Sequence, residues 1–106
     1  MANIIPDAFK SELLSGTHNF ANGGNTFKIA LFTDISGYST SSTTYSTTNE
    51  VSSSGTNYSA GGNALDSQAV SVASNTALVD FADEVFSSVT LSAVGAVIYN
   101  STNSDK

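Results

Sequence analysis

The sequence TFKIALFT at residues 26–33 decides the fold class of this chain. Its side chains alternate between two faces, and both faces are mostly apolar, with Lys28 as the one charged residue. A segment that is apolar on both faces is typical of a strand in the middle of a sheet. We therefore predict a central β-strand here.

Two further strand signals follow towards the C-terminus. Residues 67–73 and 76–82 alternate valines, alanines and a phenylalanine with polar residues, and the intervening Ser-Asn pair predicts a hairpin turn without glycine. Residues 94–99, VGAVIY, predict another buried strand, while residues 85–92 are ambiguous. The polar end, residues 101–106, is expected to fray.

Upstream of the central strand, residues 4–15 predict a short amphipathic helix. Pro6 suits the first helical position, Asp7 complements the positive end of the helix dipole, and Gly16 suits the C-terminal cap. Such a short helix is marginal alone, so it must dock on its own domain or on a neighbouring subunit. Its apolar stripe consists of Ile5, Ala8, Phe9, Leu13 and Leu14.

A hydroxyl-rich tract, SGYSTSSTTYSTTNEVSSSGTNYSAGG at residues 36–62, separates the first predicted strand from the hairpin. Its threonines favour extended backbone, and residues 50–53 are a candidate short strand. So long a loop in a compact domain usually has a purpose. The three tyrosines, Tyr38, Tyr45 and Tyr58, either pack the loop or anchor contacts with another protein.

Together these signals predict one mainly β domain over residues 1–106. We expect a small β-sandwich or open barrel, with the helix at residues 4–15 as an appendage and the tract at residues 36–62 as a long loop. At 106 residues the chain is large enough for one modest core.

The composition argues against several classes of partner. The net charge is −6, and the three cations, Lys10, Lys28 and Lys106, are scattered, so no basic stripe exists for nucleic acid or an anionic membrane. The absence of cysteine excludes disulfides and thiolate sites. The first residues lack the pattern of a signal peptide, and we expect none. A surface with only 11% charged residues tolerates close packing against like neighbours.

Catalytic and metal-binding candidates are few. His18 is the only imidazole, and we expect it to be a capping or surface residue because no nucleophile motif accompanies it. Three acids, Asp80, Asp83 and Glu84, form the nearest approach to a calcium site, but no calcium-loop motif surrounds them. We therefore predict no enzyme activity, no metal and no cofactor.

Four segments resemble a family of small structural proteins of tailed bacteriophages: IIPDAFKSELLSGTHNF, TFKIALFT, TTYSTTNEVSSSGTNYSAGG and VGAVIYN. The resemblance covers most of the chain in order and implies a virion component, on the capsid surface or in the tail or neck. It supplies no catalytic residues. It also implies a further apolar strand and a final hairpin beyond the VIY segment, so the sheet here either lacks C-terminal strands or closes differently.

These observations predict a non-enzymatic virion structural protein, first of all a capsid decoration or stabilising (cement) protein present in many copies. The expected partners are other virion subunits, including copies of the chain itself as a homo-oligomer, with no nucleic acid and no membrane. Alternatives are a tail, neck or fibre-anchor protein, a receptor- or glycan-binding β-module, and a hydrolase using His18. The candidate interaction residues are Phe9, Leu13, Leu14, Tyr38, Tyr45 and Tyr58.

Overall fold

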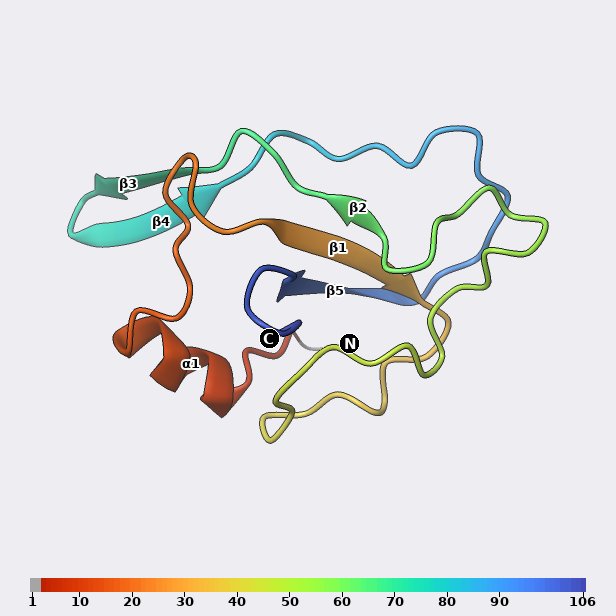
Figure 1. The fold of residues 1–106 in the computed structure, drawn as a ribbon, viewed down its shortest axis with the longest axis horizontal. Helices are drawn as coiled ribbons and strands as arrows, with labels where there is room; N and C mark the ends of the chain where they lie inside the picture. Colours follow the sequence, from red (N-terminus) through yellow and green to blue (C-terminus); the bar gives the residue numbers. More distant parts are fainter. Residues whose placement is uncertain (1–2) are drawn as a thin grey trace.

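The computed structural model describes residues 3–106 as a mainly β fold with one short helix, as the sequence predicts (Figure 1). The five strands form two antiparallel sheets, a three-stranded sheet of order β2-β1-β5 and a separate β3-β4 hairpin. The elements are α1 (Asp7–Leu14), β1 (Phe27–Phe32), β2 (Asn63–Ala64), β3 (Ala69–Ala73), β4 (Thr76–Asp80) and β5 (Gly95–Asn100).

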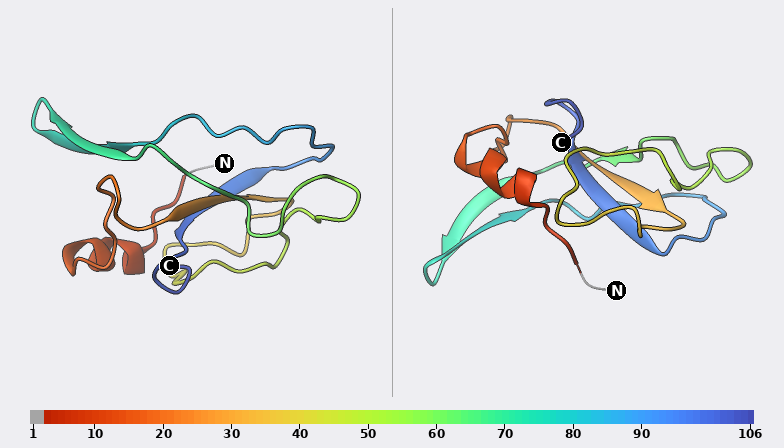
Figure 2. Two further views of the ribbon diagram at one scale, coloured as in Figure 1. Left: turned by 45° about the horizontal axis from the view of Figure 1, so that its top comes forward. Right: turned by 90° about the horizontal axis from the view of Figure 1, so that it is seen from below.

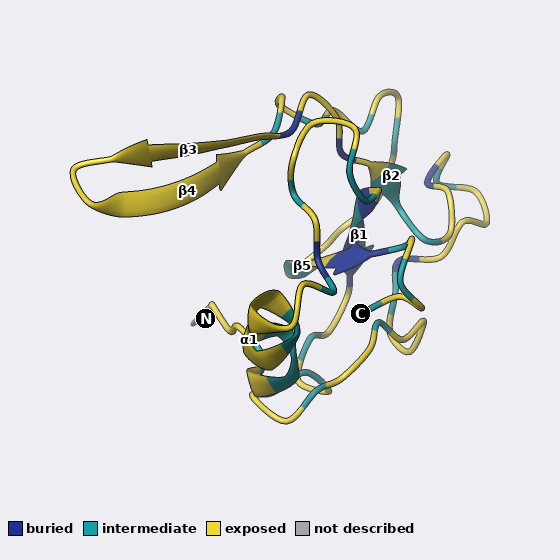
Figure 3. Ribbon diagram, turned by 60° about the vertical axis from the view of Figure 1, so that its left-hand side comes forward, coloured by how far each residue is buried: buried dark blue, intermediate teal, exposed yellow. Residues whose placement is uncertain are grey.

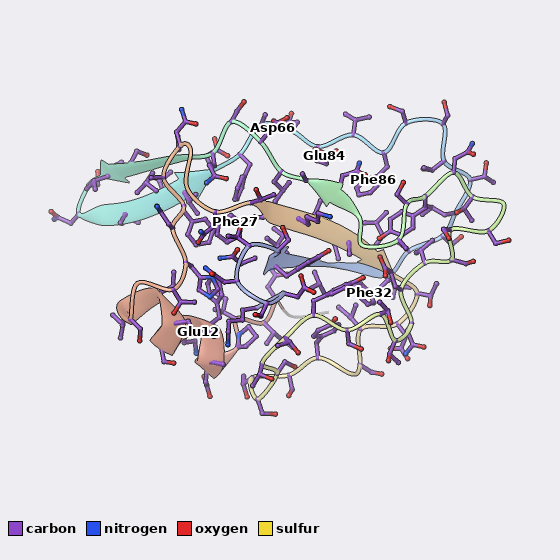
Figure 4. The ribbon with its side chains drawn as sticks, viewed as in Figure 1. Glu12, Phe27, Phe32, Asp66, Glu84 and Phe86 are labelled. Atoms are coloured by element: carbon purple, nitrogen blue, oxygen red, sulfur yellow. The ribbon has the colours of Figure 1, made fainter. Side chains whose placement is uncertain are left out.

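The prediction that residues 26–33 form a central strand is confirmed. β1 lies between β2 and β5 and pairs with β5 along its whole length, from Phe27 opposite Asn100 to Phe32 opposite Gly95. The two phenylalanines are almost fully buried and stand at the two ends of β1, as Figure 4 shows. Because they lie on opposite faces of the strand, each packs in a different part of the core.

The two edges of the three-stranded sheet are treated differently. Residues 81–94 run back along the β2 side, where the amide of Ala82 donates to Asp66 and that of Thr90 donates to Thr56 (Figures 1 and 2). The side-chain amide of Asn63 in β2 also donates to the Glu84 carboxylate at 2.7 Å. This returning segment covers the β2 edge and delivers the chain to β5 at the opposite edge.

The hydroxyl-rich tract is an ordered loop. No strand forms within residues 36–62, so the prediction of a strand at residues 50–53 is wrong. Only Glu50 pairs with the sheet, through an isolated bridge to Phe32. Asn49, directly before this segment, has a φ of 64°, and this left-handed residue interrupts the extended backbone that a longer strand needs. Tyr38 and Tyr45 of the tract pack on the cluster of Phe32, Ala30 and Tyr99. The tract therefore covers one face of the sheet.

The helix is shorter than predicted and begins at Asp7. Pro6 is extended and precedes the helix instead of occupying its first turn. The predicted cap is confirmed, because Gly16 has a φ of 77° and its amide donates to Leu13, while the amide of Thr17 donates to Glu12. These two bonds satisfy the last carbonyls of the helix in a Schellman motif.

The C-terminal residues do not fray, contrary to the prediction. The Lys106 carbonyl accepts from the amide of Asn100, the Asp105 carbonyl accepts from the amide of Tyr45, and Lys106 Nζ lies 2.7 Å from Glu12 Oε2. Polarity alone predicts a solvated end, whereas here three separate elements supply partners.

The hairpin at residues 67–73 and 76–82 is confirmed, with shorter strands at Ala69–Ala73 and Thr76–Asp80, and Val70 stands opposite Val79 and Val72 opposite Ala77. Ser74 and Asn75 both have positive φ, at 50° and 67°, so the turn is of type I′ without glycine. All ten hairpin residues are exposed, and the hairpin projects from the body of the molecule (Figures 2 and 3). It makes no face-to-face layer with the three-stranded sheet.

Candidate protein-binding groove

The free edge of β5 is the centre of the candidate site. Asn100 turns its N–H away from β1 towards the C-terminal turn, whereas Ser101 donates to Thr26 beside β1. Since these directions alternate along a strand, Ala96 and Ile98 also direct their N–H and C=O groups away from β1. Among residues 3–106, no hydrogen bond reaches these outward groups.

The free edge forms the floor of an apolar groove of about 610 Å³. One wall is built by residues 4–6, Phe9 and the aromatic rings of Phe20, Phe27 and Phe81. The other wall is built by Ile35 and residues of the tract between 38 and 45. Val79 of the hairpin also lines the groove. A strand edge lying between two walls has the form that an added β-strand requires, because backbone hydrogen bonds and side-chain pockets are offered together.

The first wall is an aromatic cluster. Phe20 stacks on Phe27 with centroids 4.0 Å apart, and Phe81 meets both rings edge-on at 6.2 and 6.1 Å. Phe9 joins from the helix, 4.5 Å from the His18 ring and 6.2 Å from Phe20. The helix therefore docks on its own domain through Phe9, one of the two possibilities left open by its sequence.

The second wall is held in place by the Glu50 carboxylate. Tyr58 Oη and the Gly61 amide each donate to Oε1 at 2.7 Å, and Tyr45 Oη donates to Oε2 at 2.5 Å. Tyr45 in turn stacks on Tyr99, with centroids 4.2 Å apart. Burial and the neighbouring carboxylate raise the pKa of both Tyr45 and Tyr58 well above the ordinary value.

Tyr58 also completes the β1 ladder. β2 is only two residues long and does not reach Leu31, whose amide donates instead to Tyr58 Oη at 2.9 Å. A tyrosine hydroxyl thus takes the place of a backbone carbonyl. This position explains why Tyr58 is only 3% exposed.

One end of the groove is closed by an ion-paired network. Glu12 of α1 contacts His18 Nε2 at 3.2 Å and Lys106 Nζ at 2.7 Å, and the Lys106 hydrogen bond lowers the pKa of Glu12. Figure 4 labels Glu12 on the helix. The Asn100 amide donates to His18 Nδ1 at 2.9 Å. The imidazole proton therefore lies on Nε2, between helix, sheet and C-terminal turn.

His18 is buried, so the prediction of a capping or surface histidine is wrong. The sequence shows one isolated imidazole, but the fold places its ring under Phe9 and between Glu12 and Asn100. Both ring nitrogens are taken by these structural partners, and no hydroxyl nucleophile is among the hydrogen-bond partners found for His18 within residues 3–106. This arrangement suits a structural histidine that joins three elements.

The six predicted interaction residues are not brought together. Leu13 and Leu14 point to solvent, with Leu14 93% exposed, while Phe9 is half-buried in the aromatic wall. Tyr38 and Tyr45 are half-buried and line the groove, and Tyr58 is buried behind it. Thus Phe9, Tyr38 and Tyr45 belong to the groove, and the two leucines form a separate exposed pair.

The predicted acidic group is also dispersed. Asp80 Oδ1 accepts from the amide of Phe81, and Glu84 turns to Asn63. Across the described part of the chain, no three histidine or acidic side chains gather as a metal ion would require. The only helix described, α1, is far too short and polar to cross a membrane.

Several groove residues were not predicted from the sequence. Residues 94–99 were expected to be buried, yet Val94 is 62% and Ile98 54% exposed; only Tyr99 in that segment is well buried. Five of the exposed large apolar residues line this one groove: Ile4, Ile5, Val79, Val94 and Ile98. The available signal was the lack of charge, because residues 67–79 and 85–104 contain none.

Comparison of the chain with family models, with curated proteins and with solved structures finds no match.

Proposed function

We propose that this protein is a non-enzymatic structural subunit that binds other protein subunits through the β5 groove. The observation that carries this proposal is an unpaired strand edge lying open in an apolar groove. Native proteins usually protect such an edge with charge, proline or covering chain, and residues 94–104 contain neither charge nor proline. An edge left in this state is suited to pairing with another polypeptide.

The low charge of the chain supports the same function. With 11% charged residues, the surface offers little repulsion to closely packed neighbours, although the net charge is −6. The groove end that does carry charge is already neutralised by the Glu12–Lys106 pair. A partner therefore meets mostly apolar side chains and backbone groups.

The location that we propose is a bacteriophage virion, with capsid decoration or stabilisation as the specific role. This assignment rests on the sequence resemblance and on the suitability of the groove for assembly. A tail, neck or fibre-anchor protein would use the same groove but be present in a different number. A glycan-binding module has less support, because Tyr45 stacks on Tyr99 and Tyr58 on Phe86, which occupies rings that a sugar would need.

Quantitative mass spectrometry of purified particles tests the location. We expect the chain in a copy number that follows the symmetry of the capsid. The small fixed number of a tail or neck ring would replace decoration with the alternative, and presence in lysate without presence in particles would overturn the virion proposal.

A groove variant tests the mechanism. Ile98→Lys places a charge beside the free edge, whereas Val85→Lys makes the same exchange at another exposed apolar residue outside the groove. We expect Ile98→Lys to abolish incorporation into particles and Val85→Lys to incorporate normally. Equal incorporation of both folded variants would show that the groove is not the binding site.

A further inference from the structure

The β3–β4 hairpin is the second unpartnered element of this chain. Val70 and Val72 share one face with Val79 and Ala77, because residues directly opposite in a ladder project to the same side. The other face is mixed, with Leu78 opposite Ser71, and with Ala69, Ala73, Thr76 and Asp80 beside them. Nevertheless, Val72 is 73% exposed, and no residue of either strand is buried (Figure 3).

An exposed two-stranded hairpin needs a partner. A lone hairpin is marginally stable in water, and a third strand or an apolar surface is required to hold it. The base is fixed by Gln68, whose side-chain amide donates to the carbonyls of Ala21 and Asn25. The arm beyond this anchor projects with its valines in solvent. Its form, with Asp80 at the base as the one charged residue, is explained if a partner covers it.

The groove and the hairpin complement each other. The groove offers an unpaired strand edge and apolar walls, while the hairpin offers unpaired outer edges and an apolar face. Val79 belongs to both, since it lies on the apolar face of the hairpin and lines the groove. The apolar face therefore continues into the groove wall, although no Cα atom of β4 lies within 8 Å of one in β5 of its own chain.

We propose that the occupant of the groove is the β3–β4 hairpin of a second copy of this chain. This inference rests on the proposed function of the groove as a protein-binding site. The hairpin adds to the free edge of β5 and turns its valine face to the aromatic wall. Two copies exchange hairpins reciprocally about a two-fold axis, so that each gives one hairpin and receives one.

Charge and size both favour this occupant. The hairpin carries one charge, Asp80 at its base, and residues 94–104 carry none, so little of the repulsion between two copies of charge −6 arises within the contact itself. Each copy contributes a ten-residue hairpin (five residues in each strand) and a groove. Counted together, the two surfaces reach the roughly 20–30 residues per partner of a standard stable interface. One-way insertion supplies about half of that area.

Light scattering coupled to size-exclusion chromatography tests the proposal on the intact chain. We expect a dimer whose Kd rises at least about tenfold in Val72→Glu, because a charge replaces an apolar group in the contact. Ser71→Glu adds the same charge on the opposite face of the same strand and is expected to leave the Kd nearly unchanged. Both positions are exposed, and circular dichroism verifies that each variant is folded.

Mixing variants identifies the partner surfaces. Val72→Glu has a defective hairpin and an intact groove, whereas Ile98→Lys has the reverse, so each alone is expected to be monomeric. Their mixture retains one intact hairpin–groove contact and is expected to form a heterodimer, with a higher Kd than the parent dimer. A chain that is monomeric at all concentrations overturns the hairpin exchange.

Other outcomes separate this inference from the proposed function. A dimer broken by Ile98→Lys but unaffected by Val72→Glu would indicate edge-to-edge pairing of two β5 strands and would also overturn the exchange. If Val72→Glu enters virions normally while Ile98→Lys does not, the groove binds a different virion protein. In that case the proposed function stands and the hairpin exchange fails.

Discussion

At the scale of single residues, Glu50 organises the tract that encloses the groove. Its two oxygens accept hydrogen bonds from Tyr45, Tyr58 and Gly61, and all three donors come from the same hydroxyl-rich segment. Charge-assisted bonds of this kind are stronger than neutral ones, and a donor left without a partner on burial is costly. One carboxylate therefore fixes a loop that has no sheet pairing beyond a single bridge.

Replacement of Glu50 tests this role. Glu50→Ala leaves the tyrosine hydroxyls and the Gly61 amide without their acceptor, and we expect a loss of about 2–3 kcal/mol in the free energy of unfolding. Glu50→Gln keeps one oxygen and is expected to lose less. Urea unfolding monitored by tyrosine fluorescence measures both. If Glu50→Ala is as stable as the parent, the carboxylate does not organise the tract.

The tyrosines predict an alkaline transition. Burial, together with nearby acids, raises the pKa of Tyr99 to about 12. The pKa values of Tyr38, Tyr45 and Tyr58 are raised as well. Below pH 10 the tyrosines are neutral in both folded and unfolded chains, and their contribution to stability is complete. Above pH 10 the unfolded chain releases protons that the folded chain retains, so stability falls as pH rises towards 12.

Tyrosinate absorbance measures this transition. We expect little ionisation near pH 10 in the folded protein, followed by a steep rise that coincides with loss of the circular dichroism signal. The same titration in concentrated urea is the control and is expected to show ionisation near pH 10. Four tyrosines that titrate near pH 10 while the protein remains folded would contradict the buried network.

At the scale of elements, Gly62 permits the tract to pass into β2. Its φ is 77°, and a Cβ at this position would overlap the carbonyl of Ile29 in β1. Gly55 also has a positive φ, of 71°, but a Cβ there meets open space. A substitution at Gly55 therefore causes backbone strain alone, whereas a substitution at Gly62 causes both backbone strain and steric overlap.

Substitution of these glycines makes the distinction measurable. Gly55→Ala carries the left-handed penalty alone, about 1–2 kcal/mol. Gly62→Ala adds the displacement of β1 or β2, and we expect a total loss of about 2–4 kcal/mol. Thermal unfolding of both variants provides the comparison. Equal losses would mean that β2 moves away from β1 freely.

The hairpin shows how much of an element's structure its own residues determine. Its strands, register and turn follow from alternation and from two residues that tolerate positive φ, so they were predictable from residues 67–82. Its exposure was not predictable, because alternation says that one face is apolar but not what covers it. The same limit applies to β5, which was predicted as a strand but not as the edge of an apolar groove.

At the scale of the whole molecule, the Glu12 network ties the helix to the C-terminal turn. The pKa of Glu12 is lowered because the folded state favours the ionised carboxylate, so ionised Glu12 stabilises the fold. This contribution to the free energy of unfolding is present when the pH is above 4.5, the ordinary pKa of a glutamate, and is lost as the pH falls through the lowered pKa of Glu12.

Lys106→Met tests the contribution of this pair. We expect a loss of about 0.5–1 kcal/mol near neutral pH, a difference that shrinks to zero in acid below the pKa of Glu12. Lys10→Met removes another lysine whose pair, with Asp7, is exposed, and is expected to change stability little at any pH. A Lys106→Met deficit that is constant with pH would show that the lysine acts by packing and not by charge.

The sequence by itself determined the mainly β class, the central position of β1, the glycine cap of the helix and the type and register of the hairpin. Each is a local property, set by alternation, backbone preference or turn chemistry within a few residues. Only the tertiary structure decided that His18 is buried, that the tyrosines of the tract surround Glu50, and that β5 lies open in a groove beside an exposed hairpin. These features join residues from distant parts of the chain, for example His18 with Asn100, and no short segment contains the information that places them together.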